Sequence, residues 1–365
     1  MHKDFLYQAL QPILFRQDPE TIHEHTLNLL HHISQIPVAG KIIEHVYHCE
    51  NSALQVQLWN KTFPNPVGVA AGFDKEGKAF NPLFALGFGF VEIGTVTPLA
   101  QPGNPKPRIF RLPEDHSLIN RLGFNNQGVA ALVSQVKNNP PDGILGINIG
   151  KNKTTANDSA VDDYETALRA VYDHAGYIVI NVSSPNTEKL RALQEQEALH
   201  KLIDRLFIIR KELVMQGQPH KTLLLKIAPD LTDETFHDII TIIHEFKLDG
   251  VIATNTTLTR NDLRSPSHTE NGGLSGAALR TRSTKIIGKL YQEFGSELPL
   301  IGVGGVFSGK DAYDKIRAGA SMVQVYTGLI YRGPAIAKFI KQELLQQLEQ
   351  DGFSSISDAV GADFR

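Results

Sequence analysis

Two lysines and a group of side-chain amides and hydroxyls stand where predicted strands end. Lys75 follows an apolar run, and Lys226 lies inside the apolar segment Leu225–Ile227. Burying an ammonium group without an anionic partner is costly, so both lysines point to an anionic ligand. The segment Asn181–Thr187 adds two amides and three hydroxyls at another strand end. A strand that ends in a simple turn would also contain Ser, Pro and Asn, so both readings of this segment remain open.

Further polar residues follow the other predicted strands. They are Asn120, Asn148, Thr254, Asn255 and Thr256. In a parallel barrel the carboxyl ends of all strands meet at one face, where active sites lie. We therefore expect these side chains to converge with Lys75 and Lys226 on one rim.

Glycines end the last two predicted strands. The segment Ile301–Val306 contains three glycines, and Val325–Gly328 ends with a hydroxyl and a glycine. Barrels commonly bind phosphate between the loops that follow strands seven and eight, through backbone N–H groups. Glycines that only make tight turns would give the same pattern.

The elements that must position these residues are short β-rich runs that alternate with longer amphipathic segments. The eight predicted strands are Val67–Gly72, Phe90–Thr97, Ile144–Gly150, Tyr177–Val182, Leu223–Ala228, Gly250–Asn255, Leu300–Val306 and Met322–Gly328. Several are apolar almost throughout, as strands covered on both faces must be. The pattern predicts an α/β fold of the (β/α)₈ TIM barrel type. A doubly wound open sheet would show the same alternation, but the count of eight favours the barrel.

A pair of short helices is predicted before the barrel. The first covers Lys3–Phe15, and the second starts at Asp18–Glu20, where aspartate can cap the helix and proline fits its first turn. Ile36 and Pro37 are expected to close the pair. This gives an N-terminal two-helix extension over residues 1–45.

Two further segments are predicted next to the barrel, one before it and one after it. The alternation between Leu54 and Phe63 predicts a small hairpin that forms the barrel floor. The polar segment Asp351–Arg365 predicts a loose tail. The expected domains are therefore the extension at 1–45, the barrel at 46–345 and a polar C-terminal tail at 346–365.

Composition excludes several function classes. A net charge of -3 and a pI near 6.5 offer no overall attraction to a polyanion, so we expect no nucleic-acid partner. The single cysteine, Cys49, cannot form an internal disulfide, and no Cys/His cluster has zinc spacing, so we expect no metal. No signal peptide and no run of about 18 apolar residues is recognised, so any membrane contact is expected to be peripheral.

Together, eight motifs resemble those of the class 2, quinone-dependent dihydroorotate dehydrogenases of bacterial type. The motifs are Ala70–Lys75, Glu92–Pro98, Asn120–Asn125, Gly146–Lys153, Asn181–Thr187, Lys226–Asp230, Ala253–Thr257 and Gly272–Gly276. They occur in family order, and the resemblance extends from Phe5 to about Leu344. It implies an FMN-dependent oxidoreductase that converts dihydroorotate to orotate in pyrimidine biosynthesis.

The resemblance also assigns site residues. Those implied to contact FMN are Ala71, Gly72, Thr95, Asn148, Asn181, Lys226, Thr254, Gly276, Gly305, Tyr326 and Thr327. Those implied to bind the substrate are Lys75, Asn120, Arg121, Leu122, Gly123, Phe124, Asn181, Asn186, Asn255 and Thr256. Lys75 would pair with the orotate carboxylate, and Lys226 would stabilise negative charge on the flavin.

Ser184 matches the catalytic base of the family. Dihydroorotate oxidation removes a proton from one ring carbon and a hydride from its neighbour, so a base must face the ring opposite the flavin. A serine hydroxyl is a poor base and must be activated, here through a relay with Thr187 or ordered water. Class 1 relatives carry cysteine at this position, whereas Cys49 lies far upstream. The serine favours class 2.

The electron acceptor is implied by the N-terminal helices. Apolar side chains on two short helices also suit a docked core element, but class 2 enzymes use such an extension to form a quinone tunnel. His23, Arg111 and Tyr326 match the residues that line it. The resemblance implies a membrane quinone, ubiquinone or menaquinone, and a peripheral location on the cytoplasmic side of the cell inner membrane.

Three other functions fit the sequence less well. A class 1-like enzyme would pass electrons to fumarate or a partner flavoprotein, and Ser184 and the helical extension oppose it. A tRNA dihydrouridine synthase would need a cysteine acid and a basic surface. A flavin-binding module without turnover would have lost the base or the carboxylate anchor, yet Ser184 and Lys75 are both present.

Overall fold

Eight parallel strands form a closed barrel in the computed structural model, which describes residues 4–365. The barrel strands are β3 (Val67–Val69), β4 (Phe90–Val96), β7 (Ile144–Ile149), β8 (Tyr177–Asn181), β9 (Leu223–Ile227), β10 (Val251–Ala253), β12 (Leu300–Val303) and β13 (Met322–Val325). Their order around the barrel is β10-β12-β13-β3-β4-β7-β8-β9. The pairing of β13 with β3 and of β9 with β10 closes the ring, so the predicted TIM barrel is confirmed and the open sheet is excluded.

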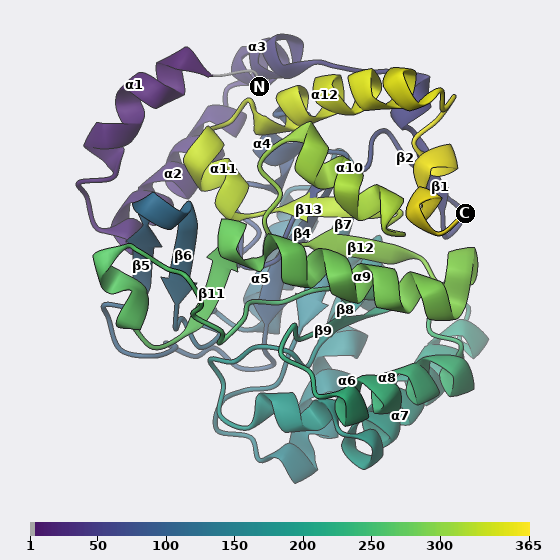
Figure 1. Ribbon diagram of the computed structural model, residues 1–365. Coiled ribbons are helices and arrows are strands. Elements are labelled where there is room, and N and C mark those ends of the chain that lie inside the picture. Colours follow the sequence, from purple (N-terminus) through teal and green to yellow (C-terminus); the bar gives the residue numbers. More distant parts are fainter. Residues whose placement is uncertain (1–3) are drawn as a thin grey trace.

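Helices surround the barrel on its outer face (Figure 1). They are α4 (Phe80–Ala85), α5 (Val129–Asn138), α6 (Ala160–Val171), α7 (Gln196–Met215), α8 (Asp233–Phe246), α9 (Arg280–Phe294), α10 (Gly309–Arg317), α11 (Thr327–Arg332) and α12 (Ile336–Asp351). All residues of β4, β8 and β9 are buried, because side chains fill the barrel on one face and pack against helices on the other. The barrel strands and these helices contribute most of one continuous apolar core.

Every barrel strand lies where the sequence predicts one, but several strands end earlier. The predicted strand Leu300–Val306 stops at Val303, because Gly304 and Gly305 have φ angles of +123° and +73°. Such angles leave the extended conformation and are accessible to glycine without strain. The last strand likewise stops at Val325, and Thr327 begins α11. These breaks turn the backbone toward the carboxyl-end face.

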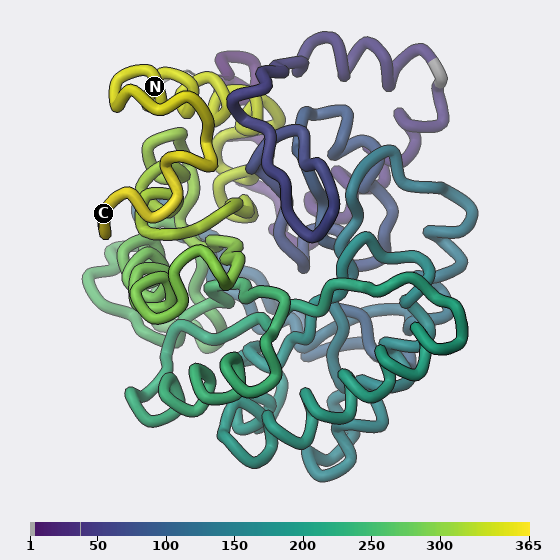
Figure 2. The backbone as a smooth tube through the Cα atoms, turned by 90° about the vertical axis from the view of Figure 1, so that its right-hand side faces the viewer, coloured from purple at the N-terminus to yellow at the C-terminus, as the bar shows by residue number. Residues whose placement is uncertain are grey.

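The predicted hairpin is confirmed and closes the opposite end of the barrel. It consists of β1 (Val56–Leu58) and β2 (Lys61–Phe63). Phe63 contacts Phe90 edge to face at 5.6 Å between ring centroids, and Trp59 lies 6.0 Å from Tyr177. Phe90 and Tyr177 are the first residues of their strands, so the hairpin covers the amino-terminal end. Figure 2 looks onto this end and shows the hairpin lying across it.

From residue 4 onward, the N-terminal extension has three helices rather than the predicted two. They are α1 (Phe5–Leu14), α2 (Pro19–Ser34) and α3 (Pro37–Tyr47). The prediction that Pro37 ends the helical region is wrong, because proline occupies the first turn of α3, where no backbone N–H is required. Lys3, predicted to start the first helix, lies outside the described residues. Asp18 caps α2 by accepting the Thr21 N–H at 2.9 Å, as predicted.

Buried polar contacts attach the extension to the barrel. Glu20 in the first turn of α2 accepts three hydrogen bonds of 2.7 to 3.1 Å from Arg108, and both side chains are almost fully buried. Tyr7 and Gln11 on α1 donate to carbonyl oxygens of α11, at Ile330 (2.5 Å) and Tyr331 (3.0 Å). The extension is therefore held by specific contacts over the face where the barrel strands end.

An additional antiparallel sheet was not anticipated from the sequence. Its strands are β5 (Ile109–Leu112), β6 (Ser117–Asn120) and β11 (Gly273–Gly276), in the order β11-β6-β5. It joins two loops far apart in sequence and brings Asn120 and Gly276 to the carboxyl-end face. The sheet is short and mixed in polarity, so its strands lack a clear alternation of apolar and polar residues.

The C-terminal segment is packed rather than loose, so that prediction is wrong. Helix α12 continues to Asp351, and Ile356 and Ala359 beyond it are fully buried. The Ile356 N–H donates to the Ala53 carbonyl at 2.7 Å, and Arg317 pairs with Asp363 at 2.8 Å. Phe353 and Val360 also pack against the core, so a few apolar side chains within a polar segment anchor it to the barrel.

Candidate active site

A cavity of about 930 Å³ opens at the carboxyl end of the barrel. This is the place expected of a barrel ligand site. The predicted site residues that line it are Ala71, Gly72, Lys75, Thr95, Asn120, Leu122, Gly123, Phe124, Asn181, Ser184, Asn186, Lys226, Thr254, Asn255, Thr256, Gly276, Gly305, Tyr326 and Thr327. They therefore meet in one cavity, as their positions at strand ends predict, while the role of each stays a prediction.

Two predicted ligand residues lie outside this lining. Arg121 points away and pairs with Glu270 at 2.7 Å, with its guanidinium 4.5 Å from the centre of the Phe110 ring. Asn148 is fully buried behind the cavity wall. Its Oδ1 accepts from the Thr95 hydroxyl at 2.5 Å and from Asn181 Nδ2 at 3.1 Å. Asn148 thus orients two lining residues instead of forming the surface itself.

A buried charge pair forms the floor of the cavity. Lys226 Nζ lies 3.6 Å from Glu92 Oε1, and Glu92 also accepts from Asn148 Nδ2 at 2.9 Å and from Gln324 Nε2 at 2.6 Å. The expectation that Lys226 requires an anionic ligand is thus partly met within the chain. A buried charge of this kind is tolerated because its partner is hydrogen-bonded on several sides.

Gln324 leaves one polar atom free at this floor. Its Oε1 is buried and has no hydrogen-bond partner among residues 4–365, although Gln324 lines the cavity. An unsatisfied buried acceptor costs about 1–3 kcal/mol, so a ligand N–H group at this position would be stabilising. Sequence reasoning missed both Gln324 and Glu92. The sequence feature that could have identified Glu92 and Gln324 is that each is a polar residue inside a mostly apolar strand.

Hydroxyls and glycines form the opposite end of the cavity. Ser275 Oγ and Thr327 Oγ1 lie 2.8 Å apart, and Gly276 and Gly305 adjoin them. A Cβ atom at Gly276 would lie 2.5 Å from the His116 carbonyl oxygen, so the close approach of backbone here requires glycine. Bare backbone beside two hydroxyls suits a phosphate group. Ser275 was not among the predicted residues.

Lys75 and three amides form the polar end nearest Ser184. Lys75 Nζ donates to Asn125 Oδ1 at 2.5 Å, and its pKa falls to about 7 because of desolvation and the nearby Arg108 charge. Asn186 Nδ2 donates to Asn120 Oδ1 at 3.1 Å. A neutral amide neutralises no charge, so Lys75 still favours an anionic ligand.

The Ser184 and Thr256 hydroxyls are both enclosed by protein. Ser184 is 6% exposed, and its Oγ accepts the Asn186 N–H at 3.3 Å. In the described part of the chain, Thr256 Oγ1 is buried without a hydrogen-bond partner, and so is the hydroxyl of Thr187, three residues after Ser184. Thr256 lines the cavity, so its hydroxyl is a group that a polar ligand would satisfy.

A second cavity, largely apolar, lies between the N-terminal helices and the barrel. Its empty space is about 1070 Å³, and it is lined mainly by apolar side chains of α1, α2 and the barrel rim, together with His23, Arg111 and Tyr326. The three residues predicted to line one tunnel therefore meet. Tyr326 also lines the first cavity, so the two cavities share a wall.

His23 is held uncharged in the second cavity. Its Nε2 lies 2.8 Å from the Phe73 carbonyl oxygen, which places the ring proton on Nε2 and leaves Nδ1 as an acceptor. Desolvation and the charge of Lys75 lower the pKa of His23 to about 4. The Phe73 ring contacts both His23 and Tyr326 edge to face, at 5.0 and 5.9 Å between centroids. An aromatic path thus links the two cavities.

Arg111 is fixed at the other side of this cavity. Its Nη1 donates to the carbonyl oxygens of Phe15 and Gln17 at 3.1 and 2.8 Å, and its guanidinium lies 4.7 Å from the centre of the Phe15 ring. These contacts bind the end of α1 to β5. Within residues 4–365 no group of three His, Cys, Asp or Glu side chains could hold a metal ion.

Comparisons with known proteins agree on one family. The family model described as dihydroorotate dehydrogenase matches residues 53–348. A protein of Christiangramia forsetii named dihydroorotate dehydrogenase (quinone) is 49% identical over 94% of this chain and 99% of its own. One of Methylobacillus flagellatus with the same name is 50% identical over 93% and 99%. The crystal structure of an Eimeria tenella dihydroorotate dehydrogenase in complex with ferulenol is 40% identical, with a TM-score of 0.88 over 97% of this chain and 99% of that one.

Proposed function

Because the chain belongs to the quinone-dependent class of the dihydroorotate dehydrogenase family, we propose that it oxidises (S)-dihydroorotate to orotate, using FMN and a membrane quinone. The reaction serves de novo pyrimidine biosynthesis. The observation that carries this proposal is the pair of adjoining cavities. One is polar and contains Lys75 and Ser184, the other is apolar, and Tyr326 lies in the wall between them. Two half-reactions with chemically different substrates need such an arrangement.

The polar cavity fits FMN. The unsatisfied Gln324 Oε1 and the Lys226 ammonium suit the imide edge of a flavin ring, and Ser275, Thr327 and Gly276 suit its phosphate. The residues proposed to hold it are Ala71, Gly72, Thr95, Asn181, Lys226, Thr254, Gly276, Gly305, Tyr326 and Thr327, with Asn148 behind them. Bound FMN would accept the hydride from the substrate and pass the electrons on.

The remaining part of the cavity suits the pyrimidine substrate. Lys75 would pair with the substrate carboxylate. The polar edges of the ring would be hydrogen-bonded by Asn120, Asn186, Asn255 and Thr256. Ser184 Oγ would take the proton from the ring carbon next to the one that loses the hydride. Thr187, with its buried and unpartnered hydroxyl, supports a relay that carries this proton away from Ser184.

The apolar cavity suits the head of a ubiquinone or menaquinone. His23 and Arg111 line this cavity, and hydrogen bonds to carbonyl oxygens fix both side chains. The His23 ring is neutral, so it places no charge beside the quinone. We propose that residues 1–45 form this quinone unit, residues 46–345 the FMN barrel and residues 346–365 a C-terminal segment.

The outer faces of the N-terminal helices suit a lipid surface. Large apolar side chains exposed there are Phe5, Leu6, Leu10, Ile13, Leu29, Ile36, Val38, Ile42 and Val46. No helix within the described part of the chain is long and apolar enough to cross a bilayer. We therefore propose peripheral attachment to the cytoplasmic face of the inner membrane, with the apolar cavity opening toward the lipid.

The decisive test separates the two half-reactions. The purified protein should carry a flavin absorption spectrum, which dihydroorotate should bleach in the absence of any acceptor. Adding a long-tailed quinone should then restore the spectrum. A protein without flavin, or one whose flavin dihydroorotate does not reduce, would refute the proposed function, and bleaching without reoxidation by quinone would refute the proposed acceptor.

A further inference from the structure

The loop that carries Ser184 has no strand or long helix of its own to hold it. It connects β8 to α7 and contains only the short 3₁₀ helix Leu190–Gln194. Loops at the rim of a barrel are its most mobile parts. The position of Ser184 over the cavity must therefore be set by contacts between this loop and its neighbours.

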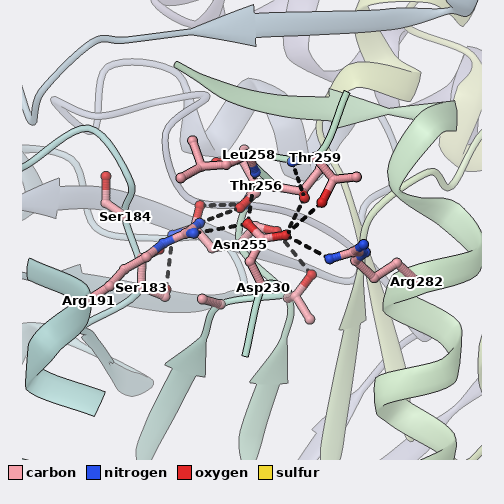
Figure 3. Close-up of polar contacts among 12 residues, drawn as sticks. Ser183, Ser184, Arg191, Asp230, Asn255, Thr256, Leu258, Thr259 and Arg282 are labelled. Carbon is pink, nitrogen blue, oxygen red and sulfur yellow. Dashed lines mark hydrogen bonds and ion pairs between the residues drawn. The ribbon is translucent and has the colours of Figure 1, made fainter. Parts of the chain in front are cut away.

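Arg191 makes those contacts with three separate segments. Its Nε donates to the Ser183 carbonyl oxygen at 3.0 Å, within the same loop. Its Nη2 donates to the Thr256 carbonyl oxygen at 2.7 Å, in the loop after β10, and its Nη1 to Asp230 Oδ2 at 2.9 Å, in the loop after β9. Figure 3 shows Arg191 reaching from the Ser183–Ser184 loop toward the Asn255–Thr256 segment, with Asp230 beyond it. A planar guanidinium spreads its donors over a fixed fork that fits three separated acceptors, whereas a lysine carries all its donors on one nitrogen.

Asp230 is itself held firmly. Its carboxylate accepts from the Thr257 hydroxyl. It also accepts from the Leu258 N–H at 2.8 Å and from Arg282 Nη1 at 2.9 Å, as Figure 3 shows. Partial burial raises the pKa of Asp230, but the hydrogen bonds from Thr257, Leu258 and Arg191 outweigh it and lower that pKa. The carboxylate therefore remains charged near neutral pH and gives Arg191 a fixed anchor.

The two loops that Arg191 joins both supply residues of the active site. Ser183 precedes Ser184, the proposed base. Thr256 follows Asn255, which is proposed to hydrogen-bond the pyrimidine ring. A further hydrogen bond, from Asn255 Nδ2 to Ser183 Oγ at 3.0 Å, joins the same loops on the cavity side. Arg191 and Asp230 do not line the cavity and so do not reach the substrate.

We propose that Arg191, anchored by Asp230, is a positioning residue that sets the distance between the Ser184 base and the pyrimidine held by Asn255 and Thr256. This inference rests on the proposed function. Proton transfer requires the base within about 3 Å of the proton it removes, and a misplacement of about 1 Å can cost roughly 10²-fold in rate. Binding depends less steeply on this distance, because Lys75 and the other amides remain in place.

The test compares Arg191→Met with a matched control, Arg282→Met. Both arginines donate to Asp230, but Arg282 comes from α9 and, within residues 4–365, makes no hydrogen bond with either active-site loop. Flavin bleaching by dihydroorotate should slow roughly 10- to 100-fold in Arg191→Met, while orotate Kd changes by less than about 3-fold. Arg282→Met should match the wild type in both measurements. An unchanged bleaching rate in Arg191→Met, or an orotate Kd that weakens as much as the rate falls, overturns the inference.

A double-mutant cycle distinguishes positioning of the base from a general structural role. In the Ser184→Ala background, Arg191→Met should cause little further loss, because the group that Arg191 positions is absent. Additive losses overturn the inference. If Arg191→Met does not fold, Arg191→Lys keeps the charge opposite Asp230 but loses the fork geometry that fits the three acceptors, and the same criteria apply to it. Bleaching of the wild-type flavin, measured first, tests the proposed function independently, so the two failures are distinguishable.

Discussion

Replacing Lys75 with methionine tests the charge that is proposed to bind the substrate carboxylate. Methionine has a similar length and removes only the ammonium group. In the structure Lys75 Nζ contacts the neutral Asn125 amide, so the substitution leaves no carboxylate without its partner. We expect Lys75→Met to retain FMN and to bind orotate more weakly.

The size of this loss follows from the type of contact. A hydrogen bond to a charged group contributes about 1.5–3 kcal/mol, which corresponds to a Kd raised roughly 10- to 150-fold. The effect must also depend on pH. Because the pKa of Lys75 is lowered to about 7, the free protein holds the ammonium below pH 7 and loses its proton above it. Wild-type affinity for orotate should therefore fall as pH rises above 7, by about tenfold per unit once the lysine is mostly neutral.

Titrating orotate into the flavoprotein at several pH values, followed through the flavin absorption spectrum, measures both effects. Lys75→Met should bind orotate with a weak Kd that varies little between pH 6 and 9. Lys78→Met is the matched control, since Lys78 is exposed, lies three positions after Lys75 and does not line the cavity. An orotate Kd unchanged in Lys75→Met, or a fall in affinity above pH 7 that persists in that variant, would refute the assignment.

Three further substitutions test other parts of the molecule. Ser184→Ala should keep FMN and orotate binding but slow flavin reduction by about 10²–10⁴-fold, and near-normal reduction in a stopped-flow measurement would exclude Ser184 as the base. His23→Ala should leave bleaching by dihydroorotate intact and slow reoxidation by a long-tailed quinone roughly tenfold, the equivalent of one hydrogen bond. The exposed His25 on the same helix provides the control, and equal reoxidation rates in the two variants would count against the quinone assignment. Ile356→Ala should lower the free energy of unfolding by about 2–5 kcal/mol, because the side chain is fully buried, and a loss below about 0.5 kcal/mol in urea denaturation would show that the C-terminal segment is loose after all.

The order of elements and the residues at the strand ends could be predicted from the sequence. Each barrel strand is buried on both faces, so it appears as a short apolar run whatever the rest of the chain does. The polar residue that follows such a run must lie at the carboxyl-end rim, which is why Lys75, Ser184 and Asn255 could be placed together. Their chemical roles came from the family resemblance, since a serine beside a strand carries no sign of being a base.

Other features depended on contacts between distant segments. The pairing of β13 with β3 decides between a closed barrel and an open sheet, and local periodicity contains no information about it. Glu92 beneath Lys226, and Arg191 between Ser183 and Thr256, are brought together by the register of the strands and the course of the loops. Burial patterns along the chain determine which segments become strands and helices, because they act over a few residues. Only the packed tertiary structure decides which polar side chains meet, because those contacts join residues up to hundreds of positions apart.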